Sequence, residues 1–190
     1  MSARAIVEDD GAGRLTIGGA RYLLIRPETL AALQKQVEVV APGAAADCLA
    51  AGGRAGGARA ARDLAGDAEA RVRSLLETGR AIGWGDFALE RLGACELVVT
   101  VAHSPFAEAY GPAVAPVCHL TRGVLESLVA RVLERPLTVR ETACVATGAP
   151  RCRFATLPDS GITVPGDDAT VPGGDSTGHA GGVTGREPTS

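Results

Sequence analysis

The chain has 190 residues, of which 46% are hydrophobic but only 3% aromatic, so we expect one domain with a core of Ala, Val and Leu. The formal net charge is −3, and residues 158–190 hold five acidic side chains against Arg186, which leaves residues 1–157 at +1. A nearly neutral body lacks the basic face of a nucleic-acid-binding protein, so no direct nucleic-acid partner is expected.

The sequence also bears on the cellular compartment. No apolar run approaches the ~20 residues that a membrane-spanning helix needs, and the N-terminal MSARAIVEDDGAGR lacks the apolar segment of a signal peptide. We therefore expect a soluble, cytoplasmic protein without a membrane partner. In a reducing compartment the five cysteines are expected to be metal ligands or buried thiols rather than disulfides.

The first elements are predicted to be a hairpin and a helix. RLTI and ARYLLI flank Gly18 and Gly19, a pair that suits a two-residue hairpin turn. Pro27 then opens a helix through ETLAALQKQVEVV. Its spacing predicts an inward stripe of Leu30, Leu33 and Val37.

A second helix is predicted in DCLAAGGRAGGARAARDLAG, which contains Gly52, Gly53, Gly56 and Gly57. Each glycine costs about 1 kcal/mol relative to alanine in a helix, and two interpretations remain open. Small residues at this spacing allow another helix or a second subunit to approach closely, which predicts a homodimer through these helices. Alternatively, the helix is frayed or broken. Cys48 is expected to be a small buried hydrophobe.

A third helix and two strands are predicted next. Asp67 can cap DAEARVRSLLETGRAIG, with Val72, Leu75 and Leu76 pointing inward. WGDFALERLGACELVVTVAHS then alternates like two strands that turn at Gly93. The segment SPFAEAYGPAVAPV, with its three prolines, is expected to be a loop.

The last elements are a helix and two strands. CHLTRGVLESLVARVLERP has the spacing of a helix, and LTVRETACVA and RCRFATL read as strands around TGAP. Residues 158–190 contain mostly Gly, Pro, Ser, Thr and Asp and are expected to be a disordered tail after a domain of residues 1–157. The element order predicts an α+β fold, an antiparallel sheet with helices packed on one side.

The residues most suggestive of chemistry are Cys118, Glu141, Cys144 and Cys152. Glu141 and Cys144 would face opposite sides of a regular strand, but a bulge or the strand's end can bring them together, and a hairpin would bring Cys144 near Cys152. Thiolates with one carboxylate favour zinc in a closed, structural site. Buried free thiols and a Cys144–Cys152 redox pair remain alternatives, as does His119 in place of Cys118.

Arginines next to these residues complete the predicted metal site. Three thiolates and one carboxylate around a dication would carry a charge of −2. Arg140, Arg151 and Arg153 lie within one residue of the proposed ligands and are expected to offset that charge.

PVCHLTRG, VRETACVATGAPRCRF, GWGDFALERL and HSPFAEAYG together resemble the 4-vinyl reductase domain family over about residues 45–157. The family includes sensor domains of phenol- and xylene-responsive activators and a bacteriochlorophyll biosynthesis protein. It shares the ligand-binding fold of the NO-signalling and Golgi-transport type. The resemblance implies zinc on Cys118, Glu141, Cys144 and Cys152. It also implies a His and a Trp at a phenolic hydroxyl, for which this chain offers His103 and Trp84.

The expected function is that of a sensory or small-molecule-binding module for an apolar ligand, whether hydrocarbon, aromatic or tetrapyrrole-like. The candidate ligand-binding residues are Trp84, Leu97, Val99, Val101, His103, Phe106 and Tyr110. One alternative is an accessory protein or reductase of tetrapyrrole metabolism, but no GxGxxG loop follows a strand and neither His103 nor His119 has an evident triad partner, so an enzyme is less favoured. Another alternative is a dimeric scaffold, by analogy of fold.

Overall fold

A computed structural model describes residues 8–9, 11–17, 19–62 and 64–157. The predicted disordered tail, residues 158–190, lies outside the described residues. None of the helices in this part of the chain combines the length and the apolar character that crossing a membrane requires.

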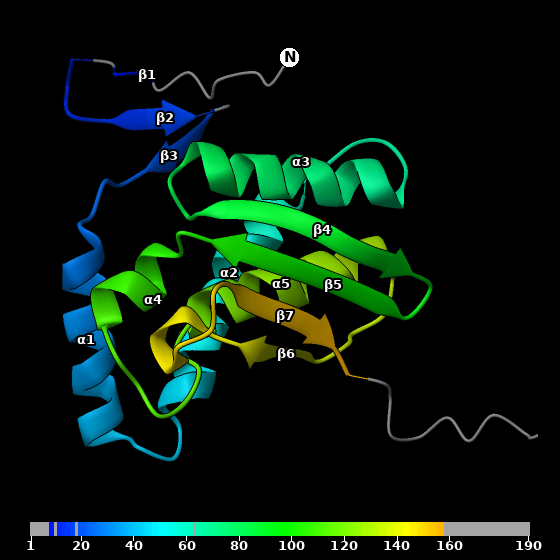
Figure 1. The fold of residues 1–190 in the computed structure, drawn as a ribbon. Coiled ribbons are helices and arrows are strands. Elements are labelled where there is room, and N and C mark those ends of the chain that lie inside the picture. Colours follow the sequence, from blue (N-terminus) through cyan, green and yellow to red (C-terminus); the bar gives the residue numbers. More distant parts are fainter. Residues whose placement is uncertain (1–7, 10, 18, 63, 158–190) are drawn as a thin grey trace, which may run out of the picture. The chain divides into compact units, whose positions relative to one another are not determined.

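The main sheet has four antiparallel strands in the order β4-β5-β7-β6 (Figure 1). These strands are β4 (Asp86–Gly93), β5 (Glu96–Ala102), β6 (Val139–Ala143) and β7 (Cys152–Thr156). Gly93 pairs with Glu96 across the first hairpin, as its position in the sequence predicts. The chain therefore has the predicted α+β fold with an antiparallel sheet.

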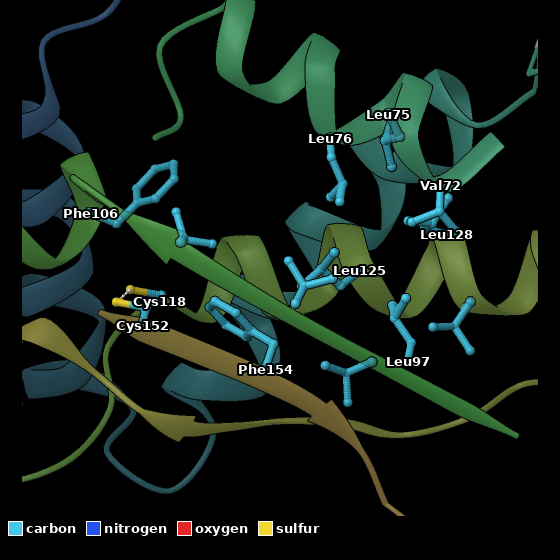
Figure 2. Packing of buried hydrophobic residues seen from close by; sticks show 14 of the residues in the cluster. Val72, Leu75, Leu76, Leu97, Phe106, Cys118, Leu125, Leu128, Cys152 and Phe154 are labelled. Atoms are coloured by element: carbon cyan, nitrogen blue, oxygen red, sulfur yellow. Dashed lines mark hydrogen bonds between the residues drawn. The ribbon is translucent and has the colours of Figure 1, made fainter. Parts of the chain in front are cut away.

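Two helices cover the sheet and complete the core. They are α3 (Ala68–Ala81) and α5 (His119–Val132). Figure 2 shows Leu75 and Leu76 of α3 and Leu125 and Leu128 of α5 in one cluster with Phe154 of β7. Burial of each such side chain contributes about 1.5–3 kcal/mol. Aliphatic residues therefore supply most of the core of this chain with few aromatics.

The glycine-rich helix α2 (Ala45–Ala60) is continuous and packs closely on α5 of the same chain. A Cβ at Gly53 would overlap the carbonyl oxygen of Leu120, and one at Gly57 would lie 2.8 Å from Val124 Cα. The predicted close approach is thus made within the chain, and the frayed-helix interpretation is wrong. Dimerisation through α2 stays a prediction, and the face carrying Gly53 and Gly57 is already covered by α5.

The N-terminal elements confirm the predicted hairpin and helix and add a strand. They are β1 (Glu8–Asp9), β2 (Leu15–Ile17), β3 (Ala20–Tyr22) and α1 (Pro27–Val40). The inward face of α1 differs from the prediction, because Ala31 and Gln34 are buried while Leu33 is 57% exposed. The Gln34 amide donates to the carbonyl oxygen of Val117 at 3.0 Å, and this bond satisfies a buried polar side chain.

Two further predictions are wrong. Cys48 is exposed, because Ala50 and Gly53 occupy the face of α2 that meets α5 and Cys48 lies on the other side of the helix. The expected loop contains a short helix, α4 (Pro105–Tyr110). Pro105 starts that helix, and the Ser104 hydroxyl caps it by accepting from the Ala107 amide.

The contact between α2 and α5 predicts the effect of adding one methyl group. Gly123→Ala would drive a Cβ into the backbone at Ala50 and should destabilise the protein by about 1–3 kcal/mol. Gly56→Ala is the matched control, since a Cβ there meets no atom within 4 Å and should stabilise the helix by up to about 1 kcal/mol. Urea unfolding measures both, and equal stability of the two variants would contradict the packing described.

Candidate functional site

Four buried side chains from separate elements meet at one point. Cys118 precedes α5, Glu141 lies on β6, Cys144 follows that strand and Cys152 begins β7. One ligand atom from each lies within 4.8 Å of all the others. The structure thus brings together the whole predicted ligand set, and the cluster could hold a metal ion.

A local irregularity lets Glu141 and Cys144 point to the same place. The register between β6 and β7 shifts between Glu141 and Ala143, and the strand then gives way to a short 3₁₀ turn, η1 (Val145–Thr147). Gly148 closes that turn at φ +91°, a conformation that glycine adopts without strain. A bulge and a strand end, the two devices that the sequence leaves open, are therefore both present.

The sulfur atoms are spaced as they would be around one small cation. Cys118 Sγ lies 3.6 Å from Cys152 Sγ (Figure 2), and Cys152 Sγ lies 4.0 Å from Cys144 Sγ. A tetrahedral zinc ion with Zn–S bonds of about 2.3 Å would separate its sulfurs by about 3.8 Å. The cluster therefore matches the size of a tetrahedral thiolate site.

The carboxylate supports the same conclusion. Glu141 Oε2 accepts a hydrogen bond from the Cys118 amide at 2.9 Å, whereas Glu141 Oε1 is buried without a hydrogen-bond partner among the described residues. Such an unsatisfied buried group costs about 1–3 kcal/mol or more. A cation bound by Glu141 Oε1 would remove that cost.

The charge of the cluster also favours a cation. Burial, followed by the interaction with Cys144, raises the pKa of Glu141 to about 8. Hydrogen bonding to Cys144 and Cys152, together with burial, raises the pKa of Cys118, whereas hydrogen bonding from Cys118 and Cys152 lowers the pKa of Cys144. Full ionisation of all four groups requires a positive charge between them.

The nearby arginines do not provide that charge. Arg140 and Arg151 are exposed, and Arg153 binds Glu90 and Thr142 instead. Residues adjacent to an inward-facing strand residue point to the opposite face, so the predicted role of these arginines is wrong. Backbone amides supply the surrounding donors: the Val145 amide donates to Cys152 Sγ at 3.4 Å.

A separate cavity of about 350 Å³ lies between α2, α3, α5 and the beginning of β4. Its walls include glycines of α2, side chains of α3 and α5, and three aromatic rings: Tyr22, Gly52, Gly56, Leu75, Leu76, Trp84, Phe87, Leu120, Thr121 and Val124. Among the described residues, none with a charged side chain lines it. The cavity is therefore suited to an uncharged, mostly apolar molecule.

The predicted ligand-binding residues are not all at this cavity. Trp84 lines it, and the Phe106 ring lies edge-on to Trp84 at 4.9 Å. Leu97, Val99 and Val101 are buried in the core, and the His103 side chain is 85% exposed. Tyr110 donates to Glu38 at 2.5 Å in a second, open hollow that His119 also lines.

Sequence reasoning missed most of the cavity wall. Apart from Trp84, the candidate residues came from β5 and the segment after it, whereas the wall comes mainly from α2, α3 and α5. The available signal was the run of glycines in α2, because glycines that face away from the closely packed helix leave open space.

Fold and site together define an α+β domain with a buried Cys₃Glu cluster and an apolar cavity. Residues 97–158 match the V4R domain family, and the resemblance to the 4-vinyl reductase domain family is thereby confirmed for that part of the chain. A stretch of 43 residues is 51% identical to the bacteriochlorophyll synthase 23 kDa chain of Cereibacter sphaeroides. This stretch is 23% of the present chain and 21% of that relative.

Two solved structures resemble most of the chain in fold. The phenol-responsive sensory domain of the transcription activator PoxR, solved with phenol, superposes with a TM-score of 0.71 at 18% identity, covering 80% of this chain and 84% of that one. A vinyl-4-reductase family protein from Methanocaldococcus jannaschii superposes with a TM-score of 0.51 at 14% identity, covering 73% of this chain and 83% of that one. At these identities the similarity establishes the shared fold.

The cluster predicts that replacing a buried cysteine and replacing an exposed cysteine have different effects on metal affinity and stability. Cys152→Ser should reduce metal affinity by more than the about 10- to 100-fold typical of losing a supporting hydrogen bond, and it should lower the unfolding midpoint. Cys48→Ser, at an exposed position of α2, is the matched control and should change neither. Metal analysis by mass spectrometry and thermal unfolding measure the two effects. Unchanged metal content in Cys152→Ser would contradict the assignment.

Proposed function

We propose that this chain is a sensory or small-molecule-binding module that holds an uncharged, mostly apolar ligand in the cavity bounded by α2, α3 and α5. The observation that carries the proposal is the cavity itself, about 350 Å³ with apolar walls and no charged lining residue among those described. Ligand sites are commonly of this size and character. The PoxR sensory domain, solved with phenol, has the same fold, and this supports a sensory role.

Few polar groups are available to orient such a ligand. The Trp84 indole N–H makes no hydrogen bond to any residue that the structure describes. The Thr78 hydroxyl donates a hydrogen bond to the Ser74 carbonyl oxygen at 2.9 Å. Thr121 and Tyr22 add two further hydroxyls to the wall. One indole donor and three hydroxyls suit a ligand with few polar substituents on an apolar body.

The proposed metal is zinc, with a structural role. Cys118, Glu141, Cys144 and Cys152 would fill a tetrahedral coordination sphere and leave no position for a substrate. When bound, zinc would join the start of α5 to the edge of the sheet. The next turn of α5 contributes Leu120 and Thr121 to the cavity, so the metal would stabilise one wall of the ligand site.

Ligand binding can be followed through Trp84, which is the only tryptophan of the chain and lines the cavity. A hydroxylated aromatic such as phenol should change its fluorescence in a saturable manner. Trp84→Phe should weaken binding of phenol by about 5- to 12-fold, the value of one hydrogen bond, and should affect toluene less. Calorimetry measures the affinities of the variant. Absence of binding of any apolar probe to the wild type would refute the proposed function.

Cobalt substitution tests the metal proposal. Protein purified under reducing conditions should contain about one zinc ion per chain. Replacement by Co²⁺ should give the intense visible absorption and thiolate charge-transfer bands of a tetrahedral sulfur site. The spectrum should disappear in Cys144→Ser and persist in Cys95→Ser, whose cysteine is exposed. A weak octahedral spectrum would contradict the ligand assignment.

A second candidate function is supported by the short stretch that is similar to a curated protein. Its 51% identity to the bacteriochlorophyll synthase 23 kDa chain favours an accessory role in tetrapyrrole metabolism. A shift of the Soret absorption band on adding protein to a porphyrin would support this candidate. An unchanged spectrum, together with binding of small aromatics, would favour the sensory module.

A further inference from the structure

The glycines of α2 face two different neighbours. Gly53 and Gly57 meet the backbone of α5, where an added Cβ would collide with it. All four glycines border the cavity together with Ala60, but an added Cβ at Gly52 or Gly56 would not collide with α5. Only the first pair is needed for the helix contact.

The second pair leaves empty space. A Cβ at Gly56 would meet no heavy atom within 4 Å, and one at Gly52 would meet only Leu120 Cδ2, at 3.7 Å. Packing therefore does not require glycine at either position, although each glycine costs about 1 kcal/mol relative to alanine. Both glycines are exposed to solvent, and their effect is to leave bare helix backbone along an accessible part of the cavity wall.

The size of the cavity indicates what that space accommodates. An apolar cavity of about 150 Å³ is sufficient for benzene, whereas this cavity measures about 350 Å³. Its wall also carries the flat rings of Trp84 and Phe87. A planar ligand of about two rings fits this volume and could pack on aromatic rings and on bare helix backbone.

We propose that Gly52 and Gly56 determine the size of the ligand, and that the ligand is an uncharged molecule with about two fused rings or the equivalent apolar bulk. The inference rests on the proposed ligand site and specifies its ligand class. A charged ligand is disfavoured because no lining residue within the described part of the chain could neutralise it. Substitution at Gly56 should therefore exclude the larger ligand while sparing a single ring.

The test compares three probes by isothermal titration calorimetry: phenol, 2-naphthol and 2-naphthoate. The wild type should bind 2-naphthol at least about tenfold more tightly than phenol, because a second ring is buried. It should bind 2-naphthoate at least about tenfold more weakly than 2-naphthol, because a buried carboxylate would have no partner.

Gly56→Leu should weaken the binding of 2-naphthol at least about tenfold and the binding of phenol by less than about threefold, since the new side chain occupies only part of the cavity. Gly56→Ala should produce a smaller change in the same direction, and it keeps the test valid should the leucine variant not fold. Ala55→Leu is the matched control, because Ala55 is exposed on the same helix and does not line the cavity. It should alter neither affinity.

The outcomes separate this inference from the proposed function. The size assignment would be overturned, and the ligand site left intact, by either of two results. One is tight binding of phenol without preference for 2-naphthol. The other is an equal loss of affinity for phenol and 2-naphthol in Gly56→Leu. Binding of 2-naphthoate as tight as that of 2-naphthol would overturn the uncharged class. Failure of the wild type to bind any probe would overturn both proposals.

Discussion

The structure depends on a short connection between the start of α5 and the edge of the sheet. The Cys118 amide donates to Glu141 of β6, and the Cys118 sulfur lies 3.6 Å from that of Cys152 on β7. Helix, strand and neighbouring strand are thus joined through groups that are individually expensive to bury. Because thiols and a carboxylate cannot all ionise in such a place without a counter-charge, the cluster is stable as a unit only when a proton or a cation completes it.

The connection extends from the cluster to the cavity by direct contacts. Ser104 lies 3.5 Å from the Cys118 sulfur and caps α4, and Phe106 of that helix lies edge-on to Trp84. Trp84 in turn lines the cavity. The cluster and the cavity are therefore connected by contacts along α4 as well as along α5, through side chains packed closely enough to leave little empty space.

The Cys₃Glu cluster could be predicted from the sequence because its residue types are rare and lie close together in the chain. Glu141, Cys144 and Cys152 lie within one hairpin, so short-range geometry brings them to one place. The cavity could not be predicted in the same way. Its walls come from three helices whose relative placement depends on how closely α2 approaches α5, and periodicity gives the face of a helix but not its distance from the next. Leu33 and Cys48 show the same limit, since the face of a helix that is buried depends on the partner it meets.

The glycines of α2 are the feature of the sequence that relates to the cavity. Had they served only to bring two helices together, the face with Gly53 and Gly57 would have been sufficient, and the positions of Gly52 and Gly56 could carry alanine without collision. Four glycines in one helix carry a cumulative cost of about 4 kcal/mol, of which half is not explained by packing. An uncompensated cost of this size in a marginally stable domain supports the proposed role of the cavity that these glycines line.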